Sequence, residues 1–230
     1  MKYYQIFRSA EPKVIGIKDG TSQVELITKD MLSESSFIDF DNHFSGSNKV
    51  FFQNQDKIDS LLPPIFRGVL RKRAFVTDLM QYGQVFRHLY YLYSERYINI
   101  LKTHNIGEFN LFPFKIENVE NLYYLLFVKA IPREEIIFKD SLLYTGQKVL
   151  ENVKYYDVNN LQQYTDLVAT TPLATFEKIA ISKEHSGKDL ISIQGAANYF
   201  YSEKLVDFLL DCGITGLQVG YNNSVQLEFV

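Results

Sequence analysis

The chain carries one 21-residue pattern twice, at a constant spacing of 108 positions. The first copy reads YLYSERYINILKTHNIGEFNL and the second, nearer the C-terminus, reads YFYSEKLVDFLLDCGITGLQV. Six of the 21 positions are identical, whereas average residue usage gives about one or two identities by chance. The identical pairs are Tyr91/Tyr199, Tyr93/Tyr201, Ser94/Ser202, Glu95/Glu203, Leu101/Leu209 and Ile106/Ile214. We infer an internal repeat.

Both copies have the pattern of an amphipathic helix with a defined start. Apolar residues recur at positions i, i+3, i+4 and i+7, which places them on one helix face. Ser94 and Ser202 stand at the N-cap position, where a side-chain oxygen accepts a hydrogen bond from a free helix amide. Glu95 and Glu203 follow in the first turn, where a carboxylate is stabilised by the helix dipole. The pattern predicts helices near residues 95–104 and 203–212.

The ends of both predicted helices are also marked. Asn105 and Gly213 stand just after them, and these residue types readily adopt the left-handed conformation that ends a helix. The next residue is Ile in both copies, where a Schellman turn brings it onto Leu101 or Leu209. Strands are expected on either side of each helix. The repeat is therefore interpreted as a strand–helix–strand unit used twice, near residues 85–112 and 191–221.

At 230 residues the chain is long enough for one large domain or two small ones. Because no linker or low-complexity segment divides it, a single domain of the α+β class is predicted over residues 1–230, with a β-rich N-terminal part at 1–73. A hydrophobic content of 46% and a charged content of 22% are ordinary for such a domain. The net charge of −3 gives no indication of a nucleic-acid partner. The first residues, MKYYQIFRSAEP, lack the apolar core of a signal peptide, and no apolar run is long enough to span a bilayer. A cytoplasmic protein with no membrane contact is predicted, and nothing indicates homo-oligomerisation.

Outside the repeat, local signals predict a set of further elements. The expected strands are 2–8, 13–18, 22–28, 50–53, 122–129, FEKIAIS, DLISIQ and VQLEFV. The segment 29–48 is polar and is expected to be mostly loop, and DGTS at 19–22 is read as a turn. AFVTDLMQYG is expected to form a short helix, with Thr77 as its cap and Gly83 as its stop.

Few residues have a pattern that carries chemistry. The histidines His43, His88, His104 and His185 lack metal-ligand spacing, and His88 is read as a strand residue. The single Cys212 excludes a cysteine-cluster metal site. A basic cluster is the best candidate for an anion contact, although a solvated sheet edge is the favoured interpretation; it comprises Arg67, Arg71, Lys72 and Arg73. No catalytic, cofactor-binding or metal-binding residue is predicted.

The second copy, preceded by DLISIQG, resembles the C-terminal signature of the bacterial immunity protein 11 family. The matching residues are Ser202, Glu203, Lys204, Gly213, Thr215 and Gly216. An upstream match consists of TDLM at 77–80 with Ser94, Glu95 and Arg96. Together the matching segments extend over residues 74–221, although helix capping accounts for much of the signature.

The resemblance implies a cytoplasmic immunity protein, an antitoxin without enzymatic activity or cofactor that binds a cognate bacterial toxin. An alternative stays open, in which the chain is an enzyme with Tyr, Glu and His residues of the repeat lining a cleft. The absence of a nucleophile–base pair or a metal pattern in the sequence favours the binding protein.

Overall fold

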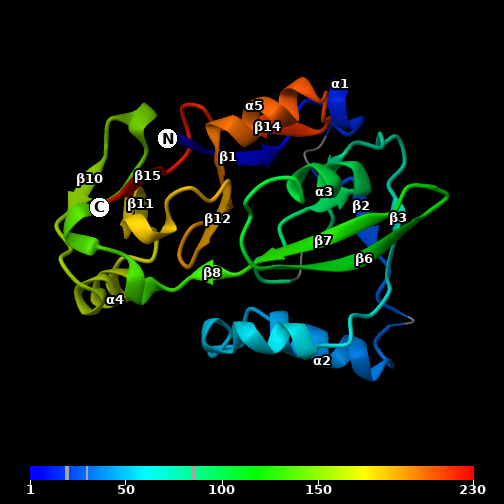
Figure 1. Cartoon of the computed structure of the whole chain (residues 1–230), viewed down its shortest axis with the longest axis horizontal. Coiled ribbons are helices and arrows are strands. Elements are labelled where there is room, and N and C mark those ends of the chain that lie inside the picture. Colours follow the sequence, from blue (N-terminus) through cyan, green and yellow to red (C-terminus); the bar gives the residue numbers. More distant parts are fainter. Residues whose placement is uncertain (19–20, 30, 84–85) are drawn as a thin grey trace.

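The computed structural model of the chain describes residues 1–18, 21–29, 31–83 and 86–230. Helices and strands occur together in mixed sheets, so the α+β class predicted from the sequence is confirmed. Within the described residues the strands form three sheets (Figure 1). No helix in this part of the chain is long and apolar enough to cross a membrane. The turn expected at 19–22 and the start of the first repeat unit at residue 85 fall partly outside the described residues.

The first sheet curves around an aromatic core. Its strand order is β2 (Val24–Leu26), β3 (Phe66–Leu70), β6 (Phe109–Glu117), β7 (Tyr123–Val128), β5 (Leu92–Ser94) and β4 (Leu79–Met80). A bridge between Val24 and Tyr82 joins the two ends of this order. Helix α2 (Ser35–Phe44) lies beside this sheet and places Phe37, Phe40 and Phe44 in its core. The 3-10 helix η1 (Phe52–Ser60) adds Ile58 to the same core.

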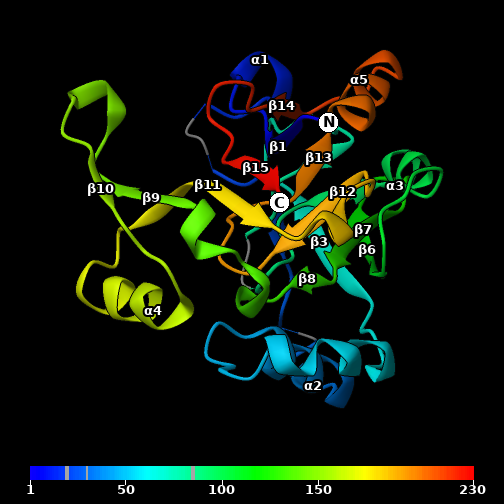
Figure 2. The same cartoon turned by 60° about the vertical axis from the view of Figure 1, so that its left-hand side comes forward.

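The second sheet has the order β14 (Leu217–Val219), β1 (Tyr3–Arg8), β13 (Phe200–Ser202), β12 (Leu190–Ile193) and β8 (Ala130–Ile131). The third sheet has the order β10 (Lys154–Tyr156), β9 (Leu142–Thr145), β11 (Thr175–Ile181) and β15 (Gln226–Phe229). Helix α4 (Leu161–Thr170) lies beside this third sheet (Figure 2). A short helix α1 (Pro12–Ile15) follows β1.

The predicted repeat is confirmed as two strand–helix–strand units. The first is β5, α3 (Glu95–Leu101) and β6, and the second is β13, α5 (Glu203–Asp211) and β14. In each unit the two strands are parallel and a third strand lies between them, antiparallel to both. This middle strand is β7 in the first unit and β1 in the second. The matching orders β6-β7-β5-β4 and β14-β1-β13-β12 extend the similarity to four strands.

The strand pairs of the two units keep the same register. A residue of the first repeat copy corresponds to the residue 108 positions later in the second copy. A residue of β1 corresponds to the residue of β7 that lies 120 positions later in the chain. The corresponding pairs are Tyr93–Tyr124 and Tyr201–Tyr4, Ser94–Tyr123 and Ser202–Tyr3, and Leu111–Leu126 and Val219–Ile6. In the first unit the middle strand β7 follows β6 along the chain. In the second unit its counterpart is β1, the N-terminal strand, so the second unit is circularly permuted relative to the first.

The two units pack against each other through a shared apolar core. Side chains alternate along a strand, so Leu126 and Val128 of β7 face the shared core while Leu125 and Phe127 face the first sheet's aromatic core. In β1, Ile6 faces the shared core and Tyr3 faces the opposite side, as its position in the register requires. Residues 1–73 thus supply β1 to one sheet and β2 and β3 to another, together with α1, α2 and η1.

The predicted helix starts are confirmed in both units. The Ser94 hydroxyl oxygen accepts from the Tyr97 amide at 3.1 Å, and that of Ser202 accepts from the Leu205 amide at 3.2 Å. At the end of α5, Gly213 has φ +65°. The Ile214 amide donates to Leu209 O at 3.1 Å and the Gly213 amide to Leu210 O at 2.8 Å, which is a Schellman turn.

The predicted left-handed turn at Asn105 is wrong. Asn105 is not among the described non-glycine residues with positive φ. Its amide donates to Asp189 Oδ2 at 3.1 Å and its carbonyl accepts from the Asp189 amide at 2.6 Å. Contacts with the other repeat unit therefore replace the local turn.

Several local predictions outside the repeat are also wrong. The expected loop at 29–48 contains α2, whose three phenylalanines form an apolar face within a polar segment. The expected strands at 13–18 and 50–53 are not formed, since α1 and the start of η1 lie there. The expected helix at 74–83 is β4, because pairing with β5 prevails over local propensity. The Thr77 hydroxyl donates to Leu79 O at 2.9 Å and so caps no helix.

Candidate functional site

Each helix cap of the repeat is held by a buried or half-buried aspartate. The Ser94 hydroxyl donates to Asp78 Oδ1 at 2.7 Å, and the Ser202 hydroxyl donates to Asp189 Oδ1 at 2.8 Å. Both aspartates immediately precede the strand that pairs with the first strand of their unit, Asp78 before β4 and Asp189 before β12. Each serine thus accepts from its helix and donates to a carboxylate, which fixes the start of the helix.

The second oxygen of each aspartate binds the opposite unit. Asp78 Oδ2 accepts from the Thr215 amide at 2.9 Å and from the Thr215 hydroxyl at 2.8 Å. Asp189 Oδ2 accepts from the amide of Asn105, which lies in the corresponding loop after α3. We call this arrangement of Asp78, Ser94, Asp189 and Ser202 the reciprocal clasp. It joins the two units through their helix ends.

Three further residues of the two matching segments, Arg96, Glu203 and Gly216, also make internal contacts. Arg96 reaches the Cys212 carbonyl of the second unit and lies 4.0 Å from the Asp78 carboxylate. Glu203 Oε1 accepts from the Tyr4 hydroxyl at 3.3 Å. Gly216 has φ +81°, and a Cβ atom there would stand 2.3 Å from Leu79 O. The signature therefore coincides with the contacts that assemble the repeat.

Four tyrosines of the repeat are buried inside the protein. Tyr93, Tyr97, Tyr199 and Tyr201 are at most 2% exposed and belong to the shared core. The Tyr199 hydroxyl donates to the Leu126 carbonyl at 2.8 Å. Burial raises the pKa of the Tyr201 hydroxyl to about 12. These hydroxyls stay protonated at neutral pH and are not accessible to a substrate.

The histidines of the first repeat region are also packed inside or between elements. His88 does not lie in a strand, contrary to the sequence prediction; it sits in a turn with φ +58° and is 9% exposed. Its Nδ1 lies 2.9 Å from the Tyr90 hydroxyl oxygen, and its ring stacks on Phe51. Burial, followed by the charges of nearby arginines, lowers the pKa of His88 to about 4. His104 packs against Phe208 of α5.

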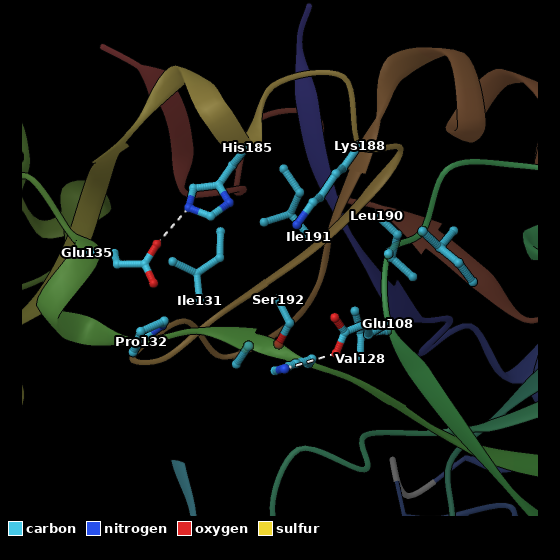
Figure 3. A pocket seen from close by; sticks show the side chains of 14 residues that line it. Glu108, Val128, Ile131, Pro132, Glu135, His185, Lys188, Leu190, Ile191 and Ser192 are labelled. Atoms are coloured by element: carbon cyan, nitrogen blue, oxygen red, sulfur yellow. Dashed lines mark hydrogen bonds and ion pairs between the residues drawn. The ribbon is translucent and has the colours of Figure 1, made fainter. Parts of the chain in front are cut away.

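A pocket of about 210 Å³ lies between the end of β7 in the first sheet and strands β8 and β12 of the second sheet (Figure 3). It is lined by residues from three separate stretches of the chain, 106–108, 128–135 and 185–192. His185 Nε2 lies 2.8 Å from Glu135 Oε2 on one wall. Glu108 and Lys129 form an ion pair of 2.9 Å on another wall, and Lys129 also binds Asp56 at 2.5 Å. Hydrogen bonds to Asp56 and then Glu108 raise the pKa of the Lys129 ammonium.

Two polar side chains of the pocket have no protein partner. Lys188 and Ser192 make no side-chain hydrogen bond or ion pair with any residue that the structure describes. Figure 3 shows Lys188 extended into the pocket, with His185 and Ser192 on either side of its amino group. Ser192 is 2% exposed overall and its side chain lines the pocket. This pocket is the one place described here where a histidine, a carboxylate, an amine and a hydroxyl come together.

The sequence did not indicate this pocket. His185 and Lys188 stand in the polar turn KEHSGK, which looks like an ordinary surface turn. Glu135 is 50 residues away from His185 and joins it only through the fold. The basic cluster at 67–73 lies elsewhere. Its four charged side chains are exposed to solvent, as the favoured interpretation expected, but the predicted sheet edge is wrong because β3 is paired with β2 on one side and β6 on the other. Its Arg71 contacts Glu25 at 4.0 Å.

The described residues contain no group of three or more histidine, cysteine or acidic residues placed to hold a metal ion. The pocket offers instead hydrogen-bond donors, an ammonium group and a histidine–glutamate pair, which suit binding of a polar group or proton transfer.

Comparison with known proteins finds no match to this chain among family models, curated proteins or solved structures.

Proposed function

We propose that this protein is a bacterial immunity protein that binds and neutralises a cognate toxin without catalysing a reaction. The proposal rests on the resemblance of the repeat to the immunity protein 11 signature. The observation that carries it is the reciprocal clasp, since the serines and aspartates of the signature are engaged in holding the two units together. Because these side chains hold the two units in a fixed arrangement, the surface that the units form is rigid. A rigid surface loses little conformational freedom when it binds a partner, which suits a binding protein.

A projecting hairpin supplies apolar surface of the kind that protein partners bury. The β9–β10 hairpin extends away from the two repeat units (Figure 2). Val149 and Leu150 at its tip are 93% and 63% exposed, and Tyr155 on β10 is 51% exposed. Exposed aromatic and aliphatic side chains are common anchors in protein interfaces.

The proposal is tested by co-expressing the chain with the toxin-like product of the neighbouring gene. Rescue of growth, together with a complex of fixed stoichiometry in size-exclusion chromatography, is the expected result. Growth arrest despite a folded, abundant protein would refute it for that toxin. The folded state of the chain is checked by circular dichroism, so that failure to fold is not mistaken for failure to protect.

The second candidate function is an enzyme that uses the pocket, and the observation that favours it is the 2.8 Å contact between His185 and Glu135. Histidine oriented by a carboxylate is a common general base. The variants His185→Gln and Glu135→Gln separate the two functions, because they remove the base while keeping hydrogen-bonding capacity. A toxin-binding protein keeps both affinity and protection in these variants. An enzyme that acts on the toxin still binds the toxin in these variants but no longer protects the cell.

The matched control is His104→Gln, which changes a histidine in contact with Phe208 and outside the pocket. The His104→Gln variant is expected to protect as well as the unchanged protein, whether the protein is a toxin-binding protein or an enzyme. Measuring toxin binding and growth protection on the same three variants decides between a toxin-binding protein and an enzyme that acts on the toxin.

A further inference from the structure

We propose that the pocket between β7 of the first sheet and β8 and β12 of the second is a binding site for a carboxylate group, held by the ammonium of Lys188 and the hydroxyl of Ser192. This inference goes beyond toxin neutralisation and does not depend on it. The carboxylate belongs either to a small free acid or to an acidic side chain of a protein partner, and both sources share the same chemistry.

Lys188 provides the charge. The other ammonium of the pocket, on Lys129, is already bound by two carboxylates, those of Asp56 and Glu108. Lys188, in contrast, has no anionic partner among the residues that the structure describes. Its side chain is partly buried and lines the pocket (Figure 3). An ammonium in a recess attracts an anion more strongly than one on an open surface, because screening by water is weaker there.

Ser192 provides the second donor. Its residue is 2% exposed, yet its hydroxyl has no hydrogen-bond partner in the described part of the chain. The hydroxyl faces the pocket and is not committed to a protein acceptor, so it is free to donate to a group bound there. A carboxylate oxygen supplies such an acceptor, and the bond to an ionised group is stronger than a neutral one.

The surrounding charges favour a monoanion. Glu108 and Glu135 also line the pocket, each bound on its own wall to a basic side chain. A dianionic phosphate would place two negative charges beside these carboxylates, and only one of the two charges would be balanced by the Lys188 ammonium. A carboxylate matches one ammonium and one hydroxyl. The remaining surface, formed by Ile131, Ile191 and Leu190, accommodates a short aliphatic chain behind the charged end.

Binding is measured by NMR titration of the methyl groups of Ile131 and Ile191, with sodium acetate as the probe. We expect saturable shifts of these two methyls and no shift of Ile100, which lies on α3 outside the pocket. Acetamide, a neutral analogue of the same shape, is expected to produce no saturable shift. Inorganic phosphate is expected to bind more weakly than acetate.

Lys188→Met and Ser192→Ala test the two donors. Each is expected to weaken acetate binding about tenfold, the usual effect of losing a hydrogen bond to a charged group. Lys183→Met is the matched control, because Lys183 lies exposed in the same turn region and does not line the pocket. Ser192→Ala removes no hydrogen bond within the described protein, so its unfolding curve should overlay that of the unchanged chain.

A capped glutamate, N-acetylglutamate N-methylamide carrying a free side-chain carboxylate, distinguishes the sources. Tighter binding of this compound than of acetate indicates an acidic side chain of a partner, and weaker binding indicates a small free acid. The proposal is overturned if acetate gives no saturable shift, if Lys188→Met binds acetate as before, or if phosphate binds as tightly as acetate.

Discussion

Replacing Ser202 by Ala should destabilise the protein far more than loss of an ordinary surface hydroxyl. Ser202 is fully buried, accepts from the Leu205 amide at 3.2 Å and donates to Asp189 Oδ1 at 2.8 Å. Loss of an N-cap costs about 0.5–2 kcal/mol. Loss of a donor to the buried Asp189 carboxylate adds about 1.5–3 kcal/mol, as is usual for hydrogen bonds to charged groups. Because the two losses overlap, we expect about 2–4 kcal/mol in the free energy of unfolding.

The assay is urea unfolding at neutral pH, followed by circular dichroism, with calorimetry as a second measurement. At this chain length, 1 kcal/mol corresponds to about 2–4 °C in Tm, so a fall of roughly 5–15 °C is expected. Ser94→Ala is the matched variant in the first unit and should have a smaller effect, since Ser94 is 5% exposed and the side chain of its partner Asp78 is 13% exposed, whereas Ser202 is fully buried and Asp189 is 6% exposed. Ser186→Ala, in an exposed turn, serves as the control.

A double-mutant cycle isolates the contact itself. The cycle of Ser202→Ala and Asp189→Ala should give a coupling energy of about 1–2 kcal/mol, because the two residues share one hydrogen bond. A loss below about 0.5 kcal/mol for Ser202→Ala, or a coupling energy near zero, would refute the structural role of the clasp.

Three further outcomes are expected. Gly213→Val should lower Tm markedly, because a β-branched residue is strained at φ +65°; an unchanged melting curve would exclude the left-handed helix end. Gly216→Ala should be more damaging than Gly213→Ala, since the new Cβ would meet Leu79 O at 2.3 Å whereas Gly213 has open space around it; equal losses would contradict that close approach. The pKa of His88 is about 4 in the folded chain and 6.5 in the unfolded one, so the unfolded state takes up the proton first on acidification and stability falls as pH drops from about 6.5 to about 4. That loss is about 3 kcal/mol for the unchanged protein and should disappear in His88→Asn; identical pH slopes would show that His88 is not the group responsible.

The parts of the fold that the sequence predicts are those fixed by short-range chemistry. The serine caps and the Schellman turn at Gly213 depend on residues within a few positions of one another, and they were predictable for that reason. Elements fixed by long-range pairing were missed. The segment 74–83 carries a plausible helix pattern, yet Leu79 and Met80 within it pair with β5 and form strand β4. Helix α2 was missed because its phenylalanine face is interrupted by polar residues and gains its stability only from the sheet it covers.

The sequence pattern also did not predict that the N-terminal strand β1 completes the second unit. YYQIF at 3–7 and YYLLF at 123–127 share three of five residues, but so short a match gains meaning only from the strand register. The aspartates of the clasp are visible in TDLM and DLISIQ, although their contacts with the opposite unit are not. The pocket combines His185, Lys188 and Ser192 with Glu135, and no spacing in the chain relates the last of these to the others.

The decisive measurement for neutralisation by binding is a titration of toxin activity with the purified protein. To hold a toxin below about 1% free at micromolar protein, the Kd must be on the order of 10 nM, or about −11 kcal/mol. An interface of ordinary size, about 800 Å² on each partner, can provide this affinity. Activity should therefore fall linearly with added protein and reach zero at a fixed molar ratio. Complete protection at a small fraction of one equivalent would mean that the protein turns over, which contradicts neutralisation by binding and supports the enzyme.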